Sequence, residues 1–331
     1  MSKPNKSGGQ LRASIAVLIL ILSTSLFFIP IFIIGLLKLF PNQRWRVLCT
    51  KLIDKTIAYW VDANNAYINR TQRVTWRING VDNLNLNPKD WYLVIANHQS
   101  WLDIVLLQRL FNRKIPTLKF FIKDQLKWVP LLGFAWWAMG SPFMKRYSKD
   151  YLLKNPEKKG QDLKATQKAL KLFKQTPSTI MNFIEGTRFT PEKKAVQKSP
   201  YQHLLKPKAG GISFVVSAMG EKIHNLLDVT IVYSDKQHSL WDFLCHRVEA
   251  ITIQVDNLSI PSQFVNCALV DNEQMQTEFR HWLNEQWLQK DALIGKLQET
   301  FNPATANEHH EKFSGEIQDT TLQNESQLPQ N

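Results

Sequence analysis

The chain has 331 residues, of which 44% are hydrophobic, and its formal net charge is +13 at pH 7. This length and composition allow a substantial buried core, which excludes wholesale disorder and predicts one large α/β domain or two modest ones. Positive charge gathers between Arg109 and Lys208, which suits nucleic acid, an anionic membrane surface or a polyphosphate ligand. Three scattered cysteines without CxxC spacing predict neither a disulfide framework nor a zinc site.

An uncharged apolar run extends from Ala13 to Leu37. As a helix it would reach about 37 Å, more than the roughly 30 Å hydrocarbon core of a bilayer. It is too long for the apolar region of a signal peptide, so we predict a retained membrane anchor over residues 1–44. Pro30 leaves open a helical hairpin in place of a single helix, and a buried soluble helix is the alternative to an anchor. Basic residues after the run place the rest of the chain in the cytoplasm.

Residues 45–70 have the pattern of an amphipathic helix. Apolar residues recur at steps of three and four from Trp45 to Val61, and charged residues occupy the other faces. Such a helix packs either in the bilayer interface or on a soluble domain, and the sequence is compatible with both.

Strand-like and helical stretches alternate over residues 71–300. The strand-like runs are Val74–Ile78, Trp91–Ala96, Thr117–Ile122, Thr179–Ile184, Leu227–Tyr233 and Ala250–Val255. Helical patterns occupy Ser100–Phe111, Gln161–Gln175 and, as one or two helices, Glu273–Leu297. This order predicts an α/β domain with a mixed, partly parallel sheet flanked by helices. Residues 301–331 are polar and acidic and are expected to be a disordered tail.

A polar turn follows the second strand-like run, with Asn97, His98 and, five residues after the histidine, Asp103. One interpretation is structural, because Ser100 and Asp103 have the spacing of a capping box at a helix start. The other is chemical. A carboxylate that accepts a hydrogen bond from one imidazole nitrogen fixes the tautomer, and the other nitrogen can then remove a proton from a substrate hydroxyl. The two interpretations are compatible.

A second polar turn, Glu185-Gly186-Thr187-Arg188, follows another apolar strand. Ligands of parallel sheets gather at the carboxyl ends of the strands, so both turns are expected to belong to one site. A solvated strand end is the alternative for this turn.

The two turns in this order resemble the first and third signature blocks of the glycerolipid acyltransferases, which include lysophosphatidic acid acyltransferases. The second block of that family is matched by Lys123-Asp124-Gln125-Leu126, Pro130, Gly133 and a stretch that ends at Arg146, and the fourth loosely by Pro207. The resemblance covers about residues 90–235 and is nearest to the branch related to lysocardiolipin and lysophosphatidate acyltransferases.

The resemblance implies transfer of a fatty acyl group from acyl-CoA or acyl carrier protein to the free hydroxyl of lysophosphatidic acid. His98 would be the general base and Asp103 its partner, without an acyl-enzyme. Arg188, Lys123 and Arg146 would bind the acceptor phosphate. The residues expected to shape the site are Asn97, Glu185, Gly186, Thr187 and Pro207.

For Glu185 two roles are open: a hydrogen bond to the glycerol, or, slightly favoured, orientation of Arg188. No metal or cofactor is implied beyond the acyl donor as co-substrate. The expected partners are membrane lipids, the lysophospholipid and the donor, at a bacterial inner membrane with the catalytic domain in the cytoplasm.

Three other functions stay open. Within the family, the acceptor could be another lysophospholipid, such as lysophosphatidylglycerol. A hydrolase would use water in place of the acceptor hydroxyl. The alternative of another class is a basic, membrane-tethered binding protein, for example for nucleic acid. The chain lacks a basic-aromatic nucleic-acid motif, so no nucleic-acid partner is expected.

Overall fold

The computed structural model describes residues 6–141, 143–144, 173–220, 222–223, 225–235, 238–265, 269 and 272–301. Arg146, most of the helical pattern at 161–175 and nearly all of the acidic tail lie outside these residues.

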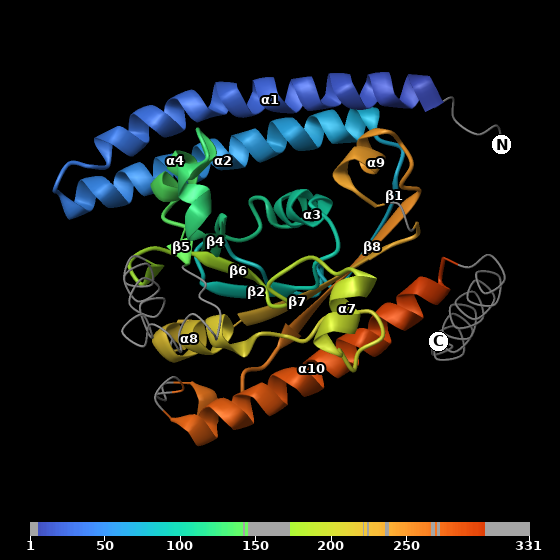
Figure 1. Ribbon diagram of the computed structural model, residues 1–331. Helices are drawn as coiled ribbons and strands as arrows, with labels where there is room; N and C mark the ends of the chain where they lie inside the picture. Colours follow the sequence, from blue (N-terminus) through green and yellow to red (C-terminus); the bar gives the residue numbers. More distant parts are fainter. Residues whose placement is uncertain are drawn as a thin grey trace, which may run out of the picture.

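A six-stranded sheet forms the centre of the described structure (Figure 1). Its strands are β1 (Thr75–Asn79), β2 (Tyr92–Ala96), β3 (Leu118–Phe120), β6 (Thr179–Phe183), β7 (Asn225–Tyr233) and β8 (Ala250–Leu258). They lie in the order β1-β8-β7-β2-β6-β3, and every neighbouring pair is parallel except β7 and β8. The mixed, partly parallel sheet is thus confirmed.

Helices cover both faces of this sheet (Figure 1). They are α1 (Lys6–Leu37), α2 (Gln43–Thr71), α3 (Leu102–Phe111), α4 (Leu132–Met139), α7 (Pro191–Gln197), α8 (Ala209–Met219), α9 (Leu240–Leu244) and α10 (Glu273–Glu299), with 3-10 helices η1 (Asp124–Trp128) and η3 (Ser262–Phe264). One apolar core joins the sheet to α3 and to the inner sides of α1 and α2. The other joins it to α8 and α10. Every residue of β2 is buried, as expected of a parallel strand covered on both faces.

The strand expected at 117–122 is divided in two. β3 ends at Phe120, and the chain then leaves the main sheet to form β4 (Ile122–Lys123), which pairs with β5 (Phe143–Met144) in a separate two-stranded sheet. Single-sequence periodicity predicts extended backbone here but not the change of partner.

The N-terminal apolar run is one continuous helix rather than a hairpin within itself. α1 passes through Pro30, although proline cannot donate the backbone hydrogen bond of a helix interior. The antiparallel hairpin is formed by α1 and α2, which pack along each other (Figure 1). α1 is long and apolar enough to cross a membrane, and little of it is buried.

Parallel pairing brings the two polar turns together. β2 and β6 are in register with Ala96 opposite Phe183, and Ala96 is also opposite Val229 of β7. Residues that follow β2 and β6 therefore leave the sheet side by side at its carboxyl edge.

Candidate active site

Asn97 fastens the first polar turn to the neighbouring strand. Its buried side-chain amide donates to the backbone oxygen of Ile231 at 2.9 Å and accepts from the backbone N–H of Ile231 at 2.8 Å. Both groups of the amide are used by backbone. Asn97 therefore positions the start of the turn and does not face a substrate.

His98 and Asp103 form a hydrogen-bonded pair. The Nδ1 atom of His98 lies 2.8 Å from Oδ2 of Asp103, whose side chain is fully buried. The same Oδ2 accepts from the backbone N–H groups of Gln99 and Ser100 at 2.7 and 2.8 Å. These contacts fix the position of the carboxylate, because three hydrogen bonds converge on one of its oxygens.

The capping box expected at this helix start is shifted. α3 begins at Leu102 rather than Ser100, and the Ser100 hydroxyl accepts from the Leu102 N–H at 3.1 Å. The Asp103 carboxylate binds the Ser100 N–H in return. Asp103 thus serves the helix start and the histidine together, because one oxygen accepts from both the backbone and the imidazole.

Tyr233 supports the carboxylate from the other side. Its buried hydroxyl, at the end of β7, donates to Oδ1 of Asp103. Burial raises the pKa of the Tyr233 hydroxyl well above its usual value, and the adjacent Asp103 carboxylate raises it further. The hydroxyl consequently stays protonated, and hence a donor, at physiological pH.

The imidazole of His98 is also held by an aromatic ring. It stacks on Phe183, with ring centroids 3.9 Å apart and an interplanar angle of 13°. Stacking and the Nδ1 contact fix both the plane and the rotation of the ring. Among the described residues, the side-chain hydrogen bond of His98 uses Nδ1, and Nε2 is not engaged by it.

Glu185 has neither of the two roles expected for it. One carboxylate oxygen accepts from the backbone N–H of His98 at 2.8 Å, and the other from that of Leu205 at 2.9 Å. The residue is fully buried, so its carboxylate cannot meet a glycerol and does not orient Arg188. Burial raises the pKa of the Glu185 carboxyl to about 7, against the opposing effect of the two backbone donors. Glu185 joins the His98 turn to the loop at Leu205.

The residues of the second polar turn after Glu185 have contacts of their own. Gly186 has a φ of +72°, a conformation that favours glycine. The Thr187 hydroxyl accepts from Nζ of Lys193 at 2.9 Å, and the same Nζ donates to the backbone oxygen of Arg188. The guanidinium carbon of Arg188 lies 5.1 Å from the ring centroid of Trp101, close to the start of α3.

A backbone bond connects this turn directly to the histidine. The N–H of Phe189 donates to the backbone oxygen of His98 at 2.7 Å. The exposed side chain of Arg188 therefore belongs to the same surface as His98, at the carboxyl edge of the sheet.

The remaining predicted residues are less closely joined to this centre. Lys123 is exposed on β4, three residues after β3 ends at the same edge, and no described hydrogen bond or ion pair connects it to His98 or Arg188. Pro207 precedes Lys208, whose N–H donates to the Ile184 oxygen at 2.7 Å, so Pro207 lies beside the second turn. Arg146 is outside the described residues.

Sequence reasoning missed four supporting residues: Phe183, Lys193, Leu205 and Tyr233. Only Tyr233 left a signal, as a hydroxyl at the end of a largely apolar strand.

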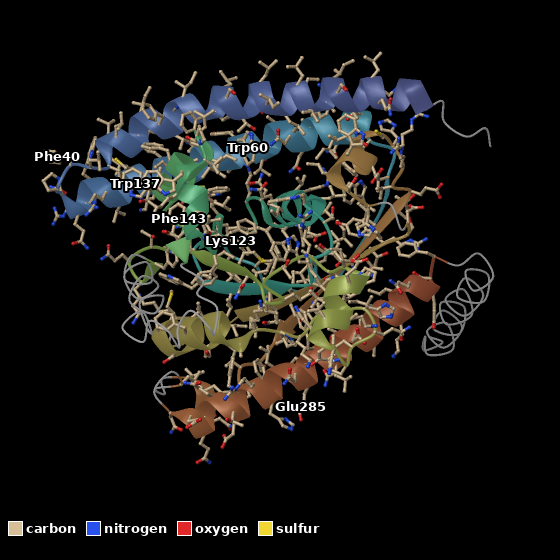
Figure 2. All side chains as sticks on the ribbon, viewed as in Figure 1. Phe40, Trp60, Lys123, Trp137, Phe143 and Glu285 are labelled. Atoms are coloured by element: carbon tan, nitrogen blue, oxygen red, sulfur yellow. The ribbon has the colours of Figure 1, made fainter. Side chains whose placement is uncertain are left out.

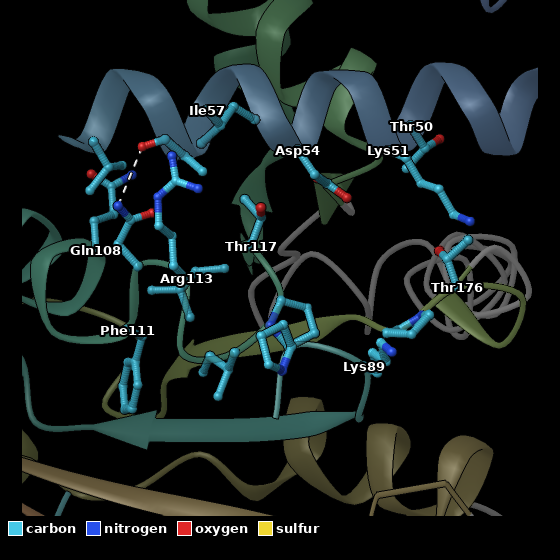
Figure 3. A pocket seen from close by; sticks show the side chains of 18 residues that line it. Thr50, Lys51, Asp54, Ile57, Lys89, Gln108, Phe111, Arg113, Thr117 and Thr176 are labelled. Carbon is cyan, nitrogen blue, oxygen red and sulfur yellow. Dashed lines mark hydrogen bonds between the residues drawn. The ribbon is translucent and has the colours of Figure 1, made fainter. Parts of the chain in front are cut away.

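A well-formed cavity lies elsewhere in the described structure. It has a volume of about 540 Å³ and is lined by Lys89, Thr117 and Thr176, which precede β2, β3 and β6 (Figure 3). Asp54 and Ile57 point into it from α2. None of the predicted site residues lines it, since it is at the amino edge of the sheet and the polar turns are at the carboxyl edge. Among the described residues, no group of three or more metal-ligating side chains is present.

Comparisons with known proteins identify the relatives of the chain. A family model described as Acyltransferase matches residues 77–234, which include both polar turns and Tyr233. The mouse (Mus musculus) 1-acyl-sn-glycerol-3-phosphate acyltransferase epsilon is 25% identical over 266 residues, 73% of this chain and 66% of that protein. The 1-acyl-sn-glycerol-3-phosphate acyltransferase of Saccharomyces cerevisiae is 31% identical over 144 residues, 43% of this chain and 42% of that protein.

The chain therefore spans less than two thirds of these relatives' own length. The fold is shared with the crystal structure of the 1-acyl-sn-glycerophosphate acyltransferase of Thermotoga maritima. The TM-score is 0.51 at 16% identity, over 88% of this chain and 96% of the other.

Proposed function

Because the chain belongs to the glycerolipid acyltransferase family, we propose that it moves a fatty acyl group onto the free hydroxyl of lysophosphatidic acid and so forms phosphatidic acid. The donor is acyl-CoA or acyl carrier protein. One observation carries the proposal: the 2.8 Å contact between Nδ1 of His98 and a buried, four-times hydrogen-bonded carboxylate, beside an exposed arginine.

The reaction follows from the free nitrogen of that pair. Nε2 of His98 accepts the proton of the acceptor hydroxyl as its oxygen attacks the thioester carbonyl carbon. The resulting oxyanion collapses, the carbon–sulfur bond breaks, and the departing thiolate takes the proton back from the imidazolium. Asp103 stabilises the transient positive charge on the ring without becoming protonated. No acyl-enzyme forms.

Arg188 is the residue proposed to bind the acceptor phosphate. A guanidinium donates two parallel hydrogen bonds to phosphate oxygens, and Trp101 holds this one by its ring face. Lys123, at the same edge, is proposed to add positive charge to the phosphate site. Arg146, outside the described residues, is proposed to bind the phosphate as well.

α1 is proposed to keep the chain on the bacterial inner membrane with the catalytic domain in the cytoplasm. The support is its length, its apolar composition and the small share of it that is buried. The acceptor is itself a membrane lipid, so an anchored enzyme meets it without leaving the bilayer.

An acceptor panel tests the proposal. The purified full-length protein in detergent is supplied with several acyl-CoAs and acyl carrier proteins, and thiol release is followed with lysophosphatidic acid, lysophosphatidylglycerol, other lysophospholipids or no acceptor. Acceptor-dependent thiol release that is fastest with lysophosphatidic acid is expected. Faster release with another lysophospholipid would reassign the acceptor, and equal release without acceptor would make the protein a thioesterase.

Tyr233→Phe should lower kcat for acyl transfer by about 2- to 10-fold. The Tyr233 hydroxyl is the donor that holds Oδ1 of Asp103. Without it, the carboxylate is less firmly positioned against the imidazole of His98.

Tyr201→Phe is the matched control, because the Tyr201 hydroxyl contacts Asn284 at 3.2 Å, away from the pair. It should leave kcat unchanged. A Tyr233→Phe enzyme with the kcat of the parent would show that the hydroxyl does not act on the pair.

A further inference from the structure

A compact group of exposed apolar side chains lies outside both α1 and the proposed active site. We call it the η1–α4 patch and define it as Trp128, Leu131, Leu132 and Trp137. Trp128 is 80% exposed, and the other three are between 42% and 48% exposed. Scattered apolar residues are normal on a protein surface, whereas four large ones within ten residues indicate a contact surface.

The patch is fixed to the end of the anchor helix. A Cβ on Gly35 of α1 would be 2.7 Å from a ring carbon of Phe134, so only glycine permits α4 to pack this closely. The Nζ of Lys38, just past α1, donates to the Ala138 oxygen at 2.8 Å in a buried contact. Phe32 and Phe134 have ring centroids 4.9 Å apart. α4 is therefore packed closely on the end of α1.

The η1–α4 segment lies beside the end of the α1–α2 hairpin. The segment from η1 to α4 rises from β4 to the level of α1 and α2 (Figure 1). Trp137 lies at the same end of the hairpin as Phe40, which is 63% exposed (Figure 2). The patch thus continues the apolar surface of the anchor.

The backbone of the loop presents these side chains in a defined way. Leu131 has a φ of +63°, which a leucine adopts only at a cost of about 1–3 kcal/mol. A Cβ on Gly133 would be 2.0 Å from the Lys127 oxygen, so the loop is folded tightly back on η1. A strained, exposed leucine at the tip of a tight loop indicates that its outward side chain has a use.

The charges beside the patch suit one kind of partner. Nζ of Lys127 lies 5.4 Å from the Trp128 ring centroid, although it also pairs with Asp124 at 2.9 Å. Exposed Arg44 and Arg46 follow the α1–α2 turn. Tryptophan flanked by basic side chains is typical of the headgroup region of an anionic bilayer.

We propose that the η1–α4 patch enters the interface of the same bilayer that holds α1, as a second point of attachment. A single helix leaves the attached domain free to rotate about the helix axis. A second contact removes that rotation and sets the domain at one orientation to the lipid surface. The inference concerns membrane contact alone and does not depend on the acyl transfer.

A depth-sensitive label tests the proposal. Single cysteines are introduced as Leu131→Cys, Leu22→Cys on α1 and Val196→Cys on α7, in a full-length background with Cys49→Ala, Cys245→Ala and Cys267→Ser. Each is labelled with an environment-sensitive NBD dye. The proteins are reconstituted into phosphatidylglycerol–phosphatidylethanolamine vesicles with or without nitroxide-labelled lipid.

Val196 is the matched control, because it is an 84% exposed apolar residue on a helix away from the hairpin. Quenching at residue 131 should be at least half that at residue 22 and several-fold that at residue 196. Residue 131 quenched no more than residue 196 would overturn the proposal. A blue-shifted label at residue 131 without nitroxide quenching would mean that protein, such as a second copy of the chain, covers the patch, and would also overturn it.

Discussion

His98→Ala should lower kcat for acyl transfer by about 10²–10⁴-fold, with the protein folded and membrane-bound. One nitrogen of the imidazole contacts the Asp103 carboxylate, and the other is the proposed proton acceptor. Replacement of His98 removes that acceptor and leaves the rest of the turn in place, since the backbone N–H of residue 98 still reaches Glu185. The measurement is thiol release in saturating donor and acceptor.

Asp103→Asn should lower kcat for acyl transfer at least as much as His98→Ala. Four donors converge on the carboxylate: the Tyr233 hydroxyl, the His98 ring and the N–H groups of Gln99 and Ser100. An asparagine amide offers one acceptor oxygen and turns an NH₂ group against donors. The ring then loses its preferred tautomer, a change that costs up to about 10⁴-fold in serine protease triads.

The control for both variants is His281→Ala. His281 also lies beside a carboxylate, with Nδ1 3.2 Å from Oε1 of Glu285, but on the exposed face of α10. It should keep full activity. Circular dichroism and vesicle flotation establish that the inactive variants are folded and bound. Turnover by His98→Ala within a few-fold of the parent would remove the histidine from the mechanism.

Arg188→Ala should raise the KM for lysophosphatidic acid about 10- to 100-fold. Hydrogen bonds to charged groups are worth roughly 1.5–3 kcal/mol, and 1.4 kcal/mol corresponds to a factor of ten. The KM of Arg188→Lys should lie between those of the parent and Arg188→Ala, because an ammonium keeps the charge but cannot donate two parallel hydrogen bonds. The measurement is an acceptor titration at saturating acyl-CoA.

A phosphate-free acceptor separates phosphate binding from general damage. With a monoacylglycerol, Arg188→Ala and the parent should have similar kcat/KM, because the lost partner of the guanidinium is absent in both. Arg77→Ala is the matched variant, since Arg77 also lies over an aromatic ring, 5.2 Å from the centroid of Phe301, on the edge strand β1. If Arg188→Ala lowered kcat/KM equally with lysophosphatidic acid and with the monoacylglycerol, phosphate binding by Arg188 would be contradicted.

The local features of the site could be predicted from sequence. His98 and Asp103 are five residues apart across a strand end and a helix start, so the chain itself brings them within reach. The same holds for the strands and helices, whose periodicities are short. Element ends were less accurate, as at α3, where the Asp103 carboxylate keeps Gln99 and Ser100 in a loop.

For the apolar N-terminal run, the sequence predicted the helix itself but not what the helix packs against. Its length and lack of charge predicted a helix that could enter a membrane, and α1 is such a helix. That its partner in the hairpin is α2 depends on contacts such as that of Ser23 with Asn64, 41 residues apart. That α4 packs on its end through Gly35 and Lys38 depends on contacts about 100 residues apart.

The roles of the other site residues depend on which strands lie side by side. Glu185 meets the His98 N–H across 87 residues, Tyr233 meets Asp103 across 130, and Asn97 meets Ile231 across 134. A carboxylate after an apolar strand has the same sequence pattern whether it faces substrate or is buried between two loops. Composition, periodicity and local spacing thus determined the α/β class, the long apolar N-terminal helix and the histidine–aspartate pair. Only the strand order and register decided which groups surround that pair, because they set which distant side chains share one edge of the sheet.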